Sequence, residues 1–376
     1  MRDAQCVLRI AYYALRNTDT LRPFSFAKER PRVNQIRLIQ VGLGGWGQDW
    51  NRNILQPSND VQLVGYVDMD SAALASAQER LGLDVHACFS TIAAALAAVE
   101  ADAVLVTAAL GAHVPVAQAA LEAGKHVLVE KPFAPTLAEA QQLVALAAER
   151  GLALMVSQNY RFYPAVRAAA ALVREGTLGL VDLVAIDFRR FANANVSMGN
   201  RHYTLTQPLL MDMAIHHFDM MRFVLGQEPQ QVNCQAWNPP WSQFRDPAEA
   251  AATITFDGGA VVSYRGSWLS TGTPTPWAGA WRIECQHGEI AFTSRADRGL
   301  GDDKLVVRSS GRKTAKPAAL PDMPLHDRAG SLAEFASAIR EQREPASSGR
   351  DNLGSLALML TAIASAEAGT PQQVGR

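Results

Sequence analysis

A glycine-rich turn that follows a short β-type run constrains the fold of this chain more than any other feature. The β-rich run 36–41 ends directly in a turn, residues 42–47, that opens a predicted helix. A second such run, 61–67, ends at Asp68, 21 residues after Gly47. A GxGxxG pattern alone is weak evidence because glycine is common. Preceded by a strand and followed by a helix and a distant acidic residue, it predicts a dinucleotide-binding Rossmann domain.

The three glycines of the pattern have separate physical roles in such a turn. Gly42 permits the tight turn, Gly44 lets the backbone approach a pyrophosphate, and Gly47 lets the helix pack closely on the strand. Unpaired N–H groups at the helix N-terminus would then face the phosphates. A glycine-rich loop without a ligand is the alternative interpretation. The predicted cofactor-binding loop comprises Gly42, Leu43, Gly44, Gly45, Trp46 and Gly47.

The acidic residue at the end of the second run indicates which dinucleotide binds. Asp68 would accept hydrogen bonds from the adenosine ribose, and its charge would repel a 2′-phosphate. The next residue, Met69, supplies no compensating cation. NAD is therefore favoured over NADP as the cofactor, unless Asp68 is only a solvated residue at a strand end.

The order of predicted elements divides the chain into an extension and two domains. Residues 1–34 form an extension expected to be poorly ordered, with room for a short helix at 5–15. In residues 35–157, strands alternate with helices of 10–15 residues, which predicts a doubly wound parallel sheet of the α/β class. In residues 158–376, short β-type runs separated by turns predict an α+β domain with an antiparallel sheet, closed by C-terminal helices.

Composition narrows the class of protein. Hydrophobic residues make up 48% of the 376 residues and charged residues 19%, enough to bury a large core. The formal charge of −1 argues against a nucleic-acid or anionic-membrane partner, and no apolar run is long enough to span a bilayer. The four cysteines are isolated, which argues against a disulfide framework or a zinc site. We therefore expect a cytoplasmic protein.

Two further patterns carry candidate catalytic groups. Lys131 follows the predicted strand 126–129, and Pro132 biases it towards an extended conformation. Asp212 and His216 stand at i and i+4 of the predicted helix 208–225, and Asp219 joins the same face. A carboxylate beside an imidazole would raise the imidazole pKa and restrict its orientation, as suits a proton acceptor. A surface lysine and an ordinary hydrogen-bonded histidine are the alternatives.

With these elements in place, the chain resembles the Gfo/Idh/MocA family of glucose–fructose oxidoreductase and inositol dehydrogenase relatives. The resemblance covers roughly residues 36–374. It is carried by the glycine loop, the run 123–132, the segment Gln158-Asn159-Tyr160-Arg161-Phe162-Tyr163-Pro164 and the Asp212-x-x-x-His216-x-x-Asp219 helix. Departures occur at 108–113 and at 207–209, where relatives usually carry other turn residues.

The resemblance implies a Rossmann domain followed by a domain with a large, mostly antiparallel open sheet, through which a homo-oligomer forms. It implies that Lys131, Asp212 and His216 are the catalytic trio. His216 would accept the proton of a substrate hydroxyl, Lys131 would stabilise the oxygen, and Asp212 would orient the imidazole or hold a hydroxyl. It also implies that Thr107, His113, Glu130 and Lys131 lie along the cofactor.

The substrate side is predicted from polar and aromatic residues near these motifs. No basic cluster points to a phosphorylated or multiply acidic substrate, which favours a neutral polyhydroxylated small molecule. Core packing is an equal alternative for Tyr160. The candidate substrate-binding residues are Asn159, Tyr160, Arg161, Tyr203 and Trp277.

These observations favour an NAD-dependent dehydrogenase that transfers a hydride between nicotinamide and a hydroxyl-bearing carbon of a sugar, inositol or related polyol. One alternative is a glycosidase or epimerase that keeps its nicotinamide bound and oxidises the substrate only transiently. Another is a non-catalytic sensor of nucleotides or sugars on the same fold, which would be expected to lack Lys131 or His216.

Overall fold

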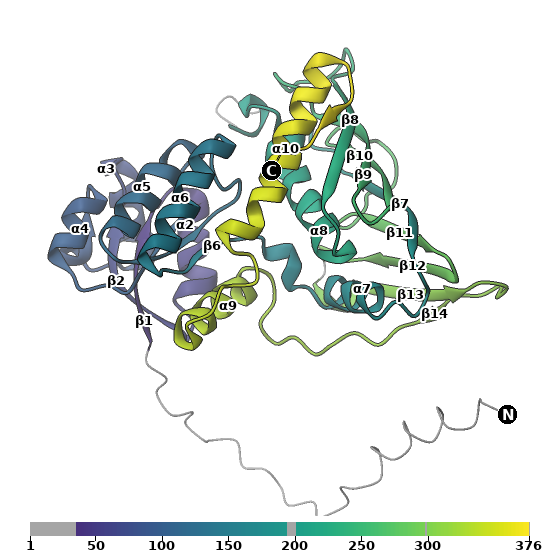
Figure 1. Ribbon diagram of the computed structural model, residues 1–376. Coiled ribbons are helices and arrows are strands. Elements are labelled where there is room, and N and C mark those ends of the chain that lie inside the picture. The colour runs from purple at the N-terminus through teal and green to yellow at the C-terminus, as the bar shows by residue number, and fades with distance from the viewer. Residues whose placement is uncertain (1–34, 194–200, 298, 376) are drawn as a thin grey trace, which may run out of the picture. The chain divides into compact units, whose positions relative to one another are not determined.

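The computed structural model describes residues 35–193, 201–297 and 299–375 (Figure 1). The helix expected at 5–15 lies outside the described residues. Within the described part, the chain from Gln35 onward forms one compact unit. None of the helices in these ranges combines the length and the apolar character needed to cross a membrane.

The first half forms a six-stranded sheet in which every neighbouring pair is parallel. The strand order is β3-β2-β1-β4-β5-β6, the order of a dinucleotide-binding Rossmann domain. The predicted α/β class is therefore confirmed. The strands are β1 (Ile36–Val41), β2 (Val61–Val67), β3 (Cys88–Phe89), β4 (Ala103–Val106), β5 (His126–Val129) and β6 (Leu154–Val156).

Alternate residues of the central strands belong to two different cores. Ile39 and Val104 pack with α4 (Ile92–Ala98), α5 (Leu110–Glu122) and α6 (Leu137–Arg150) on one face. Leu38 and Leu105 point to the other face. Because successive strand residues point to opposite sides, both faces of a parallel sheet need cover. α3 (Ser71–Leu81) connects β2 to β3.

The second face is completed by a helix from the far end of the chain. Trp50 of α2 (Gly45–Trp50) and Leu55 of the π-helical turn η1 (Asn51–Leu55) share a core with Phe335 of α9 (Asp327–Glu341). α9 therefore packs on the Rossmann sheet (Figure 1). One of the C-terminal helices expected to close the second domain thus also covers a sheet face of the first.

The second half carries a nine-stranded sheet, ordered β14-β13-β12-β11-β7-β10-β9-β8-β15. All pairings are antiparallel except that of β7 with β10, as the predicted α+β domain requires. The strands are β7 (Val181–Arg189), β8 (Pro229–Trp237), β9 (Glu249–Phe256), β10 (Val261–Ser267), β11 (Ala280–Cys285), β12 (Gly288–Thr293), β13 (Lys304–Ser309), β14 (Lys316–Pro317) and β15 (Gln372–Gln373).

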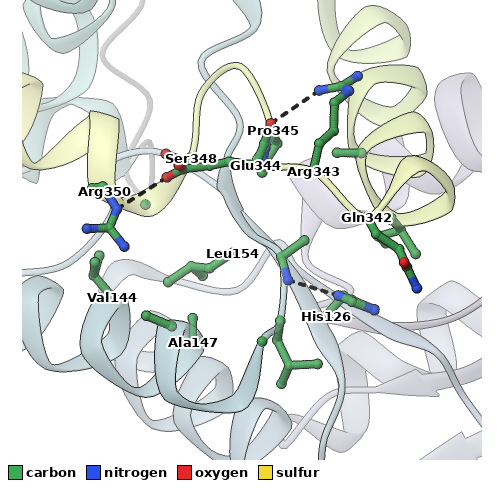
Figure 2. Close-up of a pocket in the computed structure, with 17 residues that line it drawn as sticks. His126, Val144, Ala147, Leu154, Gln342, Arg343, Glu344, Pro345, Ser348 and Arg350 are labelled. Carbon is green, nitrogen blue, oxygen red and sulfur yellow. Dashed lines mark hydrogen bonds and ion pairs between the residues drawn. The ribbon is translucent and has the colours of Figure 1, made fainter.

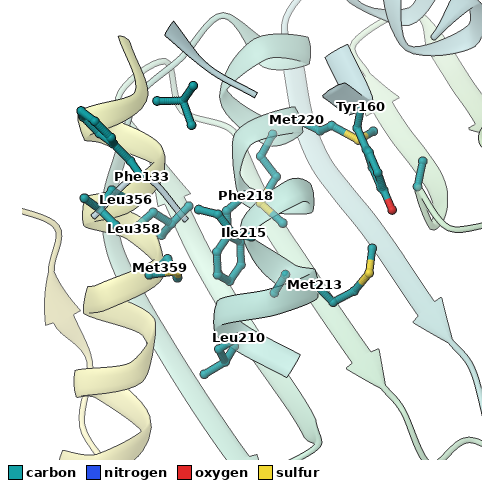
Figure 3. Close-up of a cluster of buried hydrophobic side chains, with 14 of the residues drawn as sticks. Phe133, Tyr160, Leu210, Met213, Ile215, Phe218, Met220, Leu356, Leu358 and Met359 are labelled. Atoms are coloured by element: carbon teal, nitrogen blue, oxygen red, sulfur yellow. The ribbon is translucent and has the colours of Figure 1, made fainter. Parts of the chain in front are cut away.

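Helices cover one face of this sheet. α10 (Gly349–Ala368) packs on α8 (Ile215–Leu225), on β8 and on α6 of the Rossmann domain, and α7 (Pro164–Glu175) packs on α8. Figure 3 shows Phe218 of α8 and Met359 of α10 pointing towards each other in this core. The opposite sheet face carries exposed polar side chains such as Ser263, Arg265 and Arg282.

A buried ion-pair network joins the segments around α8. Arg161, in the short helix η3 (Asn159–Phe162), donates from Nε and Nη2 to both carboxylate oxygens of Asp219, at 2.6 Å each. It also pairs with Asp351 of α10 at 2.6 Å. The side chains of Arg161 and Asp219 are 3% and 1% exposed. Together these groups stabilise the packing of η3, α8 and α10. Removal of any one of them would leave a buried charge without its partner.

Asp219→Ala should lower the free energy of unfolding by about 3–5 kcal/mol, because it leaves the buried Arg161 guanidinium without its main partner. Denaturant unfolding measures this loss. Glu100→Ala is the matched control, since it removes a carboxylate that is 89% exposed from its ion pair with Arg37. Equal unfolding curves for the two variants would contradict a stabilising role for Asp219.

Candidate active site

The glycine loop has the close backbone contacts that the sequence predicts. Gly42 has a φ of +95°, and a Cβ there would lie 2.3 Å from the backbone nitrogen of Ala108. A Cβ on Gly47 would lie 1.9 Å from the carbonyl oxygen of Gly42. A Cβ on Gly44 or Gly45 would meet nothing within 4 Å. The loop is therefore packed tightly against the strand ends below it and open above it, where a dinucleotide would lie.

Polar side chains hold this loop from beneath. Gln40 of β1 donates to the carbonyl oxygen of Gly47 at 2.7 Å. The hydroxyl of Thr107 donates to the carbonyl oxygen of Gly42 at 2.7 Å, and it accepts from Gln40. Gln40 and Thr107 are both buried. Thr107 therefore positions the loop; its contact with the cofactor stays a prediction.

Asp68 lies beside the loop at the end of β2. Its Oδ2 accepts the N–H of Leu43 at 2.7 Å, and its Oδ1 accepts the N–H of Asp70 at 2.9 Å. Each carboxylate oxygen has a second lone pair, so both can still accept a ribose hydroxyl. Met69 is 89% exposed. The residues present therefore fit the adenosine half of a dinucleotide.

His113 and Glu130 were expected along the cofactor, but their side chains are hydrogen-bonded to other protein groups. His113 is buried with Nδ1 2.9 Å from the oxygen of Pro132 and Nε2 3.1 Å from the oxygen of Ala108. Glu130 accepts the indole N–H of Trp50 at 2.7 Å, and burial raises the pKa of its carboxyl. Both residues fix the ends of the strands around the site.

Trp46, the remaining loop candidate, lies at the open side of the site. Its side chain is partly exposed, and the guanidinium of Arg328 in α9 lies 4.3 Å from its ring. Arg328 also pairs with Asp49 at 2.6 Å. The glycine loop and α9 therefore meet at this edge.

The structure brings Lys131 and Asp212 together from the two domains. Lys131 directly follows β5, next to a cis peptide bond to Pro132. Its Nζ donates to Oδ1 and to the carbonyl oxygen of Asp212, both at 2.7 Å. Burial tends to raise the pKa of the Asp212 carboxyl, but the charge and hydrogen bond of Lys131 outweigh it and hold the pKa below its usual range. The ion pair thus fixes the ammonium at the carboxyl edge of the Rossmann sheet.

The helix that carries Asp212 and His216 is less regular than predicted. Residues Pro208–Ala214 form a π-helical segment, η5, and the α-helix starts at Ile215. Gln207 precedes the segment with a φ of +46° and caps it without a side-chain hydrogen bond. Asp212 therefore lies in the widened turn, where its carboxylate reaches Lys131.

His216 is oriented by an aromatic ring. Its imidazole stacks on the ring of Tyr160, with centroids 4.1 Å apart and planes 7° apart. The residue is 7% exposed, and its Nδ1 is enclosed without a hydrogen-bond partner in the described part of the chain. Nε2 is not enclosed in this way, so it is the nitrogen available to a ligand.

The pKa of His216 corrects the sequence-based expectation. This pKa lies well below 6.5. Burial of the ring is the largest cause, and the positive charges of Lys131 and Arg295 lower the pKa further. We expected a neighbouring carboxylate to raise it, but Asp212 is bound by Lys131. His216 is therefore a neutral imidazole near pH 7, with a lone pair that can accept a proton.

Two candidates from the sequence lie in the protein interior. Asp219 does not join a face with Asp212 and His216, because its carboxylate is bound by Arg161 and by the hydroxyl of Ser355. The guanidinium of Arg161 is buried and donates to Asp219, Asp351 and the oxygen of Ala346, so it is not exposed to a substrate. The expectation that Arg161 binds substrate is therefore corrected.

The other substrate candidates differ in what their polar atoms bind. The hydroxyl of Tyr203 donates to the oxygen of Ala192, and the side chain is buried. Asn159 is also buried and donates to Asp327. The indole N–H of Trp277 donates to Asp297 at 2.7 Å. Only Tyr160, through its stack on His216, is shown in direct contact with the trio.

Sequence reasoning missed Arg295, which follows β12. Its Nη1 donates to the hydroxyl of Tyr160 at 2.7 Å, and its charge reaches His216. No sequence pattern marks it, because an arginine after a strand of an antiparallel sheet is ordinary. Only the fold places it beside η3.

A separate cavity of about 460 Å³ lies away from these groups. It is lined by residues of α6, α9 and the start of α10, and Figure 2 shows His126 and Leu154 among them. These two residues begin β5 and β6, so the cavity lies at the amino ends of the strands. Ligands of such sheets bind at the carboxyl ends. The cavity is therefore not the candidate active site.

Comparison with known families agrees with this architecture. The model of an oxidoreductase family with an NAD-binding Rossmann fold matches residues 36–158. The model of the GFO/IDH/MocA C-terminal domain matches residues 166–291. The chain belongs to the Gfo/Idh/MocA family. It is an oxidoreductase with a Rossmann domain for a nicotinamide dinucleotide, as the sequence predicts.

Similar members of the Gfo/Idh/MocA family span most of the chain. A D-apiose dehydrogenase from Paraburkholderia graminis is 26% identical, over 90% of this chain and 89% of that protein. An inositol 2-dehydrogenase from Rhizobium meliloti is 27% identical, over 88% and 96% respectively. An oxidoreductase from Agrobacterium radiobacter, solved with NAD+, L-tartaric acid and magnesium, has a TM-score of 0.78 at 21% identity, covering 91% of this chain and 99% of that one. The last likeness shows the fold.

The imidazole of His216 should stay neutral down to a pH well below 6.5, because its burial and two nearby cations disfavour the charged form. An NMR titration of the histidines, assigned with His216→Gln, measures this. Tyr160→Leu should move the midpoint upward by opening the ring to water, whereas Tyr160→Phe, which keeps the stack, should move it less. A midpoint above 6.5 in the unmodified protein would contradict this description.

Proposed function

We propose that this protein is a dehydrogenase that transfers a hydride between NAD and a hydroxyl-bearing carbon of a sugar, inositol or related polyol. The proposal is supported mainly by the convergence of Lys131, Asp212 and a neutral His216 at the carboxyl edge of the Rossmann sheet. Relatives named as D-apiose dehydrogenase and inositol 2-dehydrogenase are consistent with this substrate class.

The protein groups would divide the chemistry as follows. When bound, the nicotinamide supplies the hydride acceptor. Nε2 of His216 takes the hydroxyl proton as the carbonyl forms. The ammonium of Lys131 lies where it can donate to the substrate oxygen, and so stabilises negative charge on it.

Asp212 acts on Lys131 and not on the imidazole. Its carboxylate binds Nζ at 2.7 Å and fixes the ammonium in place. The side chain is 42% exposed, so it can also accept a substrate hydroxyl. Tyr160 takes the orienting role that the sequence assigned to Asp212, because its ring holds the imidazole plane.

Asp68 supports NAD over NADP as the cofactor. Its two oxygens are oriented by the N–H groups of Leu43 and Asp70, and the exposed neighbour Met69 offers no cation to a 2′-phosphate. A ribose diol can donate to this carboxylate, whereas a phosphate would be repelled.

We also propose that the sheet face left uncovered by α7, α8 and α10 is the surface through which the chain forms a homo-oligomer. A broad face of a nine-stranded sheet with polar exposed residues supports this.

Lys131→Ala and His216→Ala should each lower kcat by at least about 100-fold, the usual scale for loss of a proton-transfer group. NAD affinity should stay nearly unchanged, because the glycine loop and Asp68 would still hold the pyrophosphate and the adenosine ribose. Steady-state NAD reduction with a panel of sugars and inositols, together with calorimetric NAD titration, measures both quantities. Lys313→Ala, on an exposed turn, is the control.

Wild-type rates in either alanine variant would contradict the proposed trio. In the same assay, NADH that accumulates in step with product supports a dehydrogenase. Turnover of substrate without accumulation of NADH would instead support a glycosidase or epimerase that oxidises the substrate transiently.

Asp68→Ser combined with Met69→Arg should reverse the cofactor preference, because it replaces the repelling carboxylate by a cation that can pair with a 2′-phosphate. Titration of both variant and parent with NAD and NADP measures the ratio of affinities. Tighter binding of NADP than of NAD by the parent chain would contradict the assignment of NAD.

A further inference from the structure

Arg295 lies between two aromatic rings at the edge of the candidate active site. Its guanidinium carbon is 4.8 Å from the centroid of Tyr160 and 5.4 Å from that of Trp277. Nη1 donates to the hydroxyl of Tyr160 at 2.7 Å. Because Tyr160 also stacks on His216, one aromatic ring separates this guanidinium from the imidazole.

The backbone holds Arg295 in one place. Its N–H donates to Asp303 at 2.8 Å, and its carbonyl oxygen accepts the N–H of Trp277 at 3.0 Å. The residue has a φ of +59°, a region that residues with a Cβ seldom adopt. The main chain of Arg295 is therefore held in place, and the hydrogen bond from Nη1 to Tyr160 positions the guanidinium.

Arg295 differs from the other cations nearby in its lack of a carboxylate partner. Lys131 pairs with Asp212, and Arg190 pairs with Asp297 at 2.8 Å. Arg295 makes no ion pair within 4.0 Å in the part of the chain that the structure describes, although the charge of Asp327 acts on it from further away. A half-buried guanidinium without a carboxylate partner can therefore still form an ion pair with an anion that binds beside it.

Arg295 is half-buried, so part of its side chain remains accessible to a ligand. Its side chain also hydrogen-bonds Tyr163, and in the described part of the chain none of its nitrogens is an enclosed polar atom without a partner. Its charge is also one of those that lower the pKa of His216, after burial and Lys131. The guanidinium of Arg295 and the imidazole of His216 both contact the ring of Tyr160.

We infer that the substrate carries a carboxylate, which Arg295 binds while His216 and Lys131 act on a hydroxyl of the same molecule. This inference rests on the proposed function and narrows its substrate class to polyhydroxylated acids such as aldonates or uronates. A planar carboxylate matches the N–H fork of one guanidinium, whereas a phosphate dianion would need more positive charge. The neutral substrate favoured by the sequence lacks such a partner.

The test compares acids with their neutral parent sugars in the full-length protein with NAD. We expect kcat/KM for the best acid to exceed that of its neutral counterpart by at least about tenfold, the effect of about 1.4 kcal/mol in the transition state. Arg295→Met should remove this preference by slowing the acid alone. Arg295→Lys should restore part of it, and Arg312→Met, on an exposed turn, should leave it unchanged.

Several outcomes would overturn the inference. Equal kcat/KM for acids and neutral sugars in the unmodified protein would do so even if Arg295→Met failed to fold. Equal losses for both substrates in Arg295→Met would show that Arg295 only supports Tyr160. A preference for sugar phosphates would identify a different anion. By contrast, absence of NAD reduction with every acid and every neutral sugar would reject the proposed function itself.

Discussion

The ion pair between Lys131 and Asp212 is the interaction on which the site depends, because it joins the two domains at the point where chemistry is expected. Lys131 ends a strand of one sheet, and Asp212 lies in a π-helical turn of the other domain. The pair satisfies both charges and leaves the ammonium at the carboxyl edge of the parallel sheet. Any shift of one domain against the other would separate these groups. The geometry of the site therefore depends directly on how the two domains pack.

That packing is secured by elements that cross between the domains. α10 contacts α6 on one side and α8 and β8 on the other, and α9 covers the Rossmann sheet. The buried pair of Arg161 and Asp219 joins η3 to α8. These contacts hold Tyr160 against His216, which keeps the imidazole neutral and oriented.

The environment of His216 shows how burial and charge act together. Removal of the ring from water disfavours the imidazolium, and Lys131 and Arg295 disfavour it further. The carboxylate of Asp212, one helical turn before His216 in the sequence, is paired with Lys131. The result is a site with positive charges around a neutral acceptor, which suits the development of negative charge on a substrate oxygen.

The sequence by itself determined the parallel Rossmann sheet, the tight glycine loop, the antiparallel second half and the position of Lys131 at a strand end. These features depend on local periodicity and on turns that only glycine fits. The tertiary structure alone decided the roles of Asp219, Arg161 and Tyr160. It also decided that α9 packs on the first sheet and that Arg295 lies beside Tyr160. A helix face predicts which residues are neighbours along one helix. A helix face does not predict which distant side chain pairs with a given carboxylate. That pairing depends on three-dimensional packing and on the need of every buried charge for a partner.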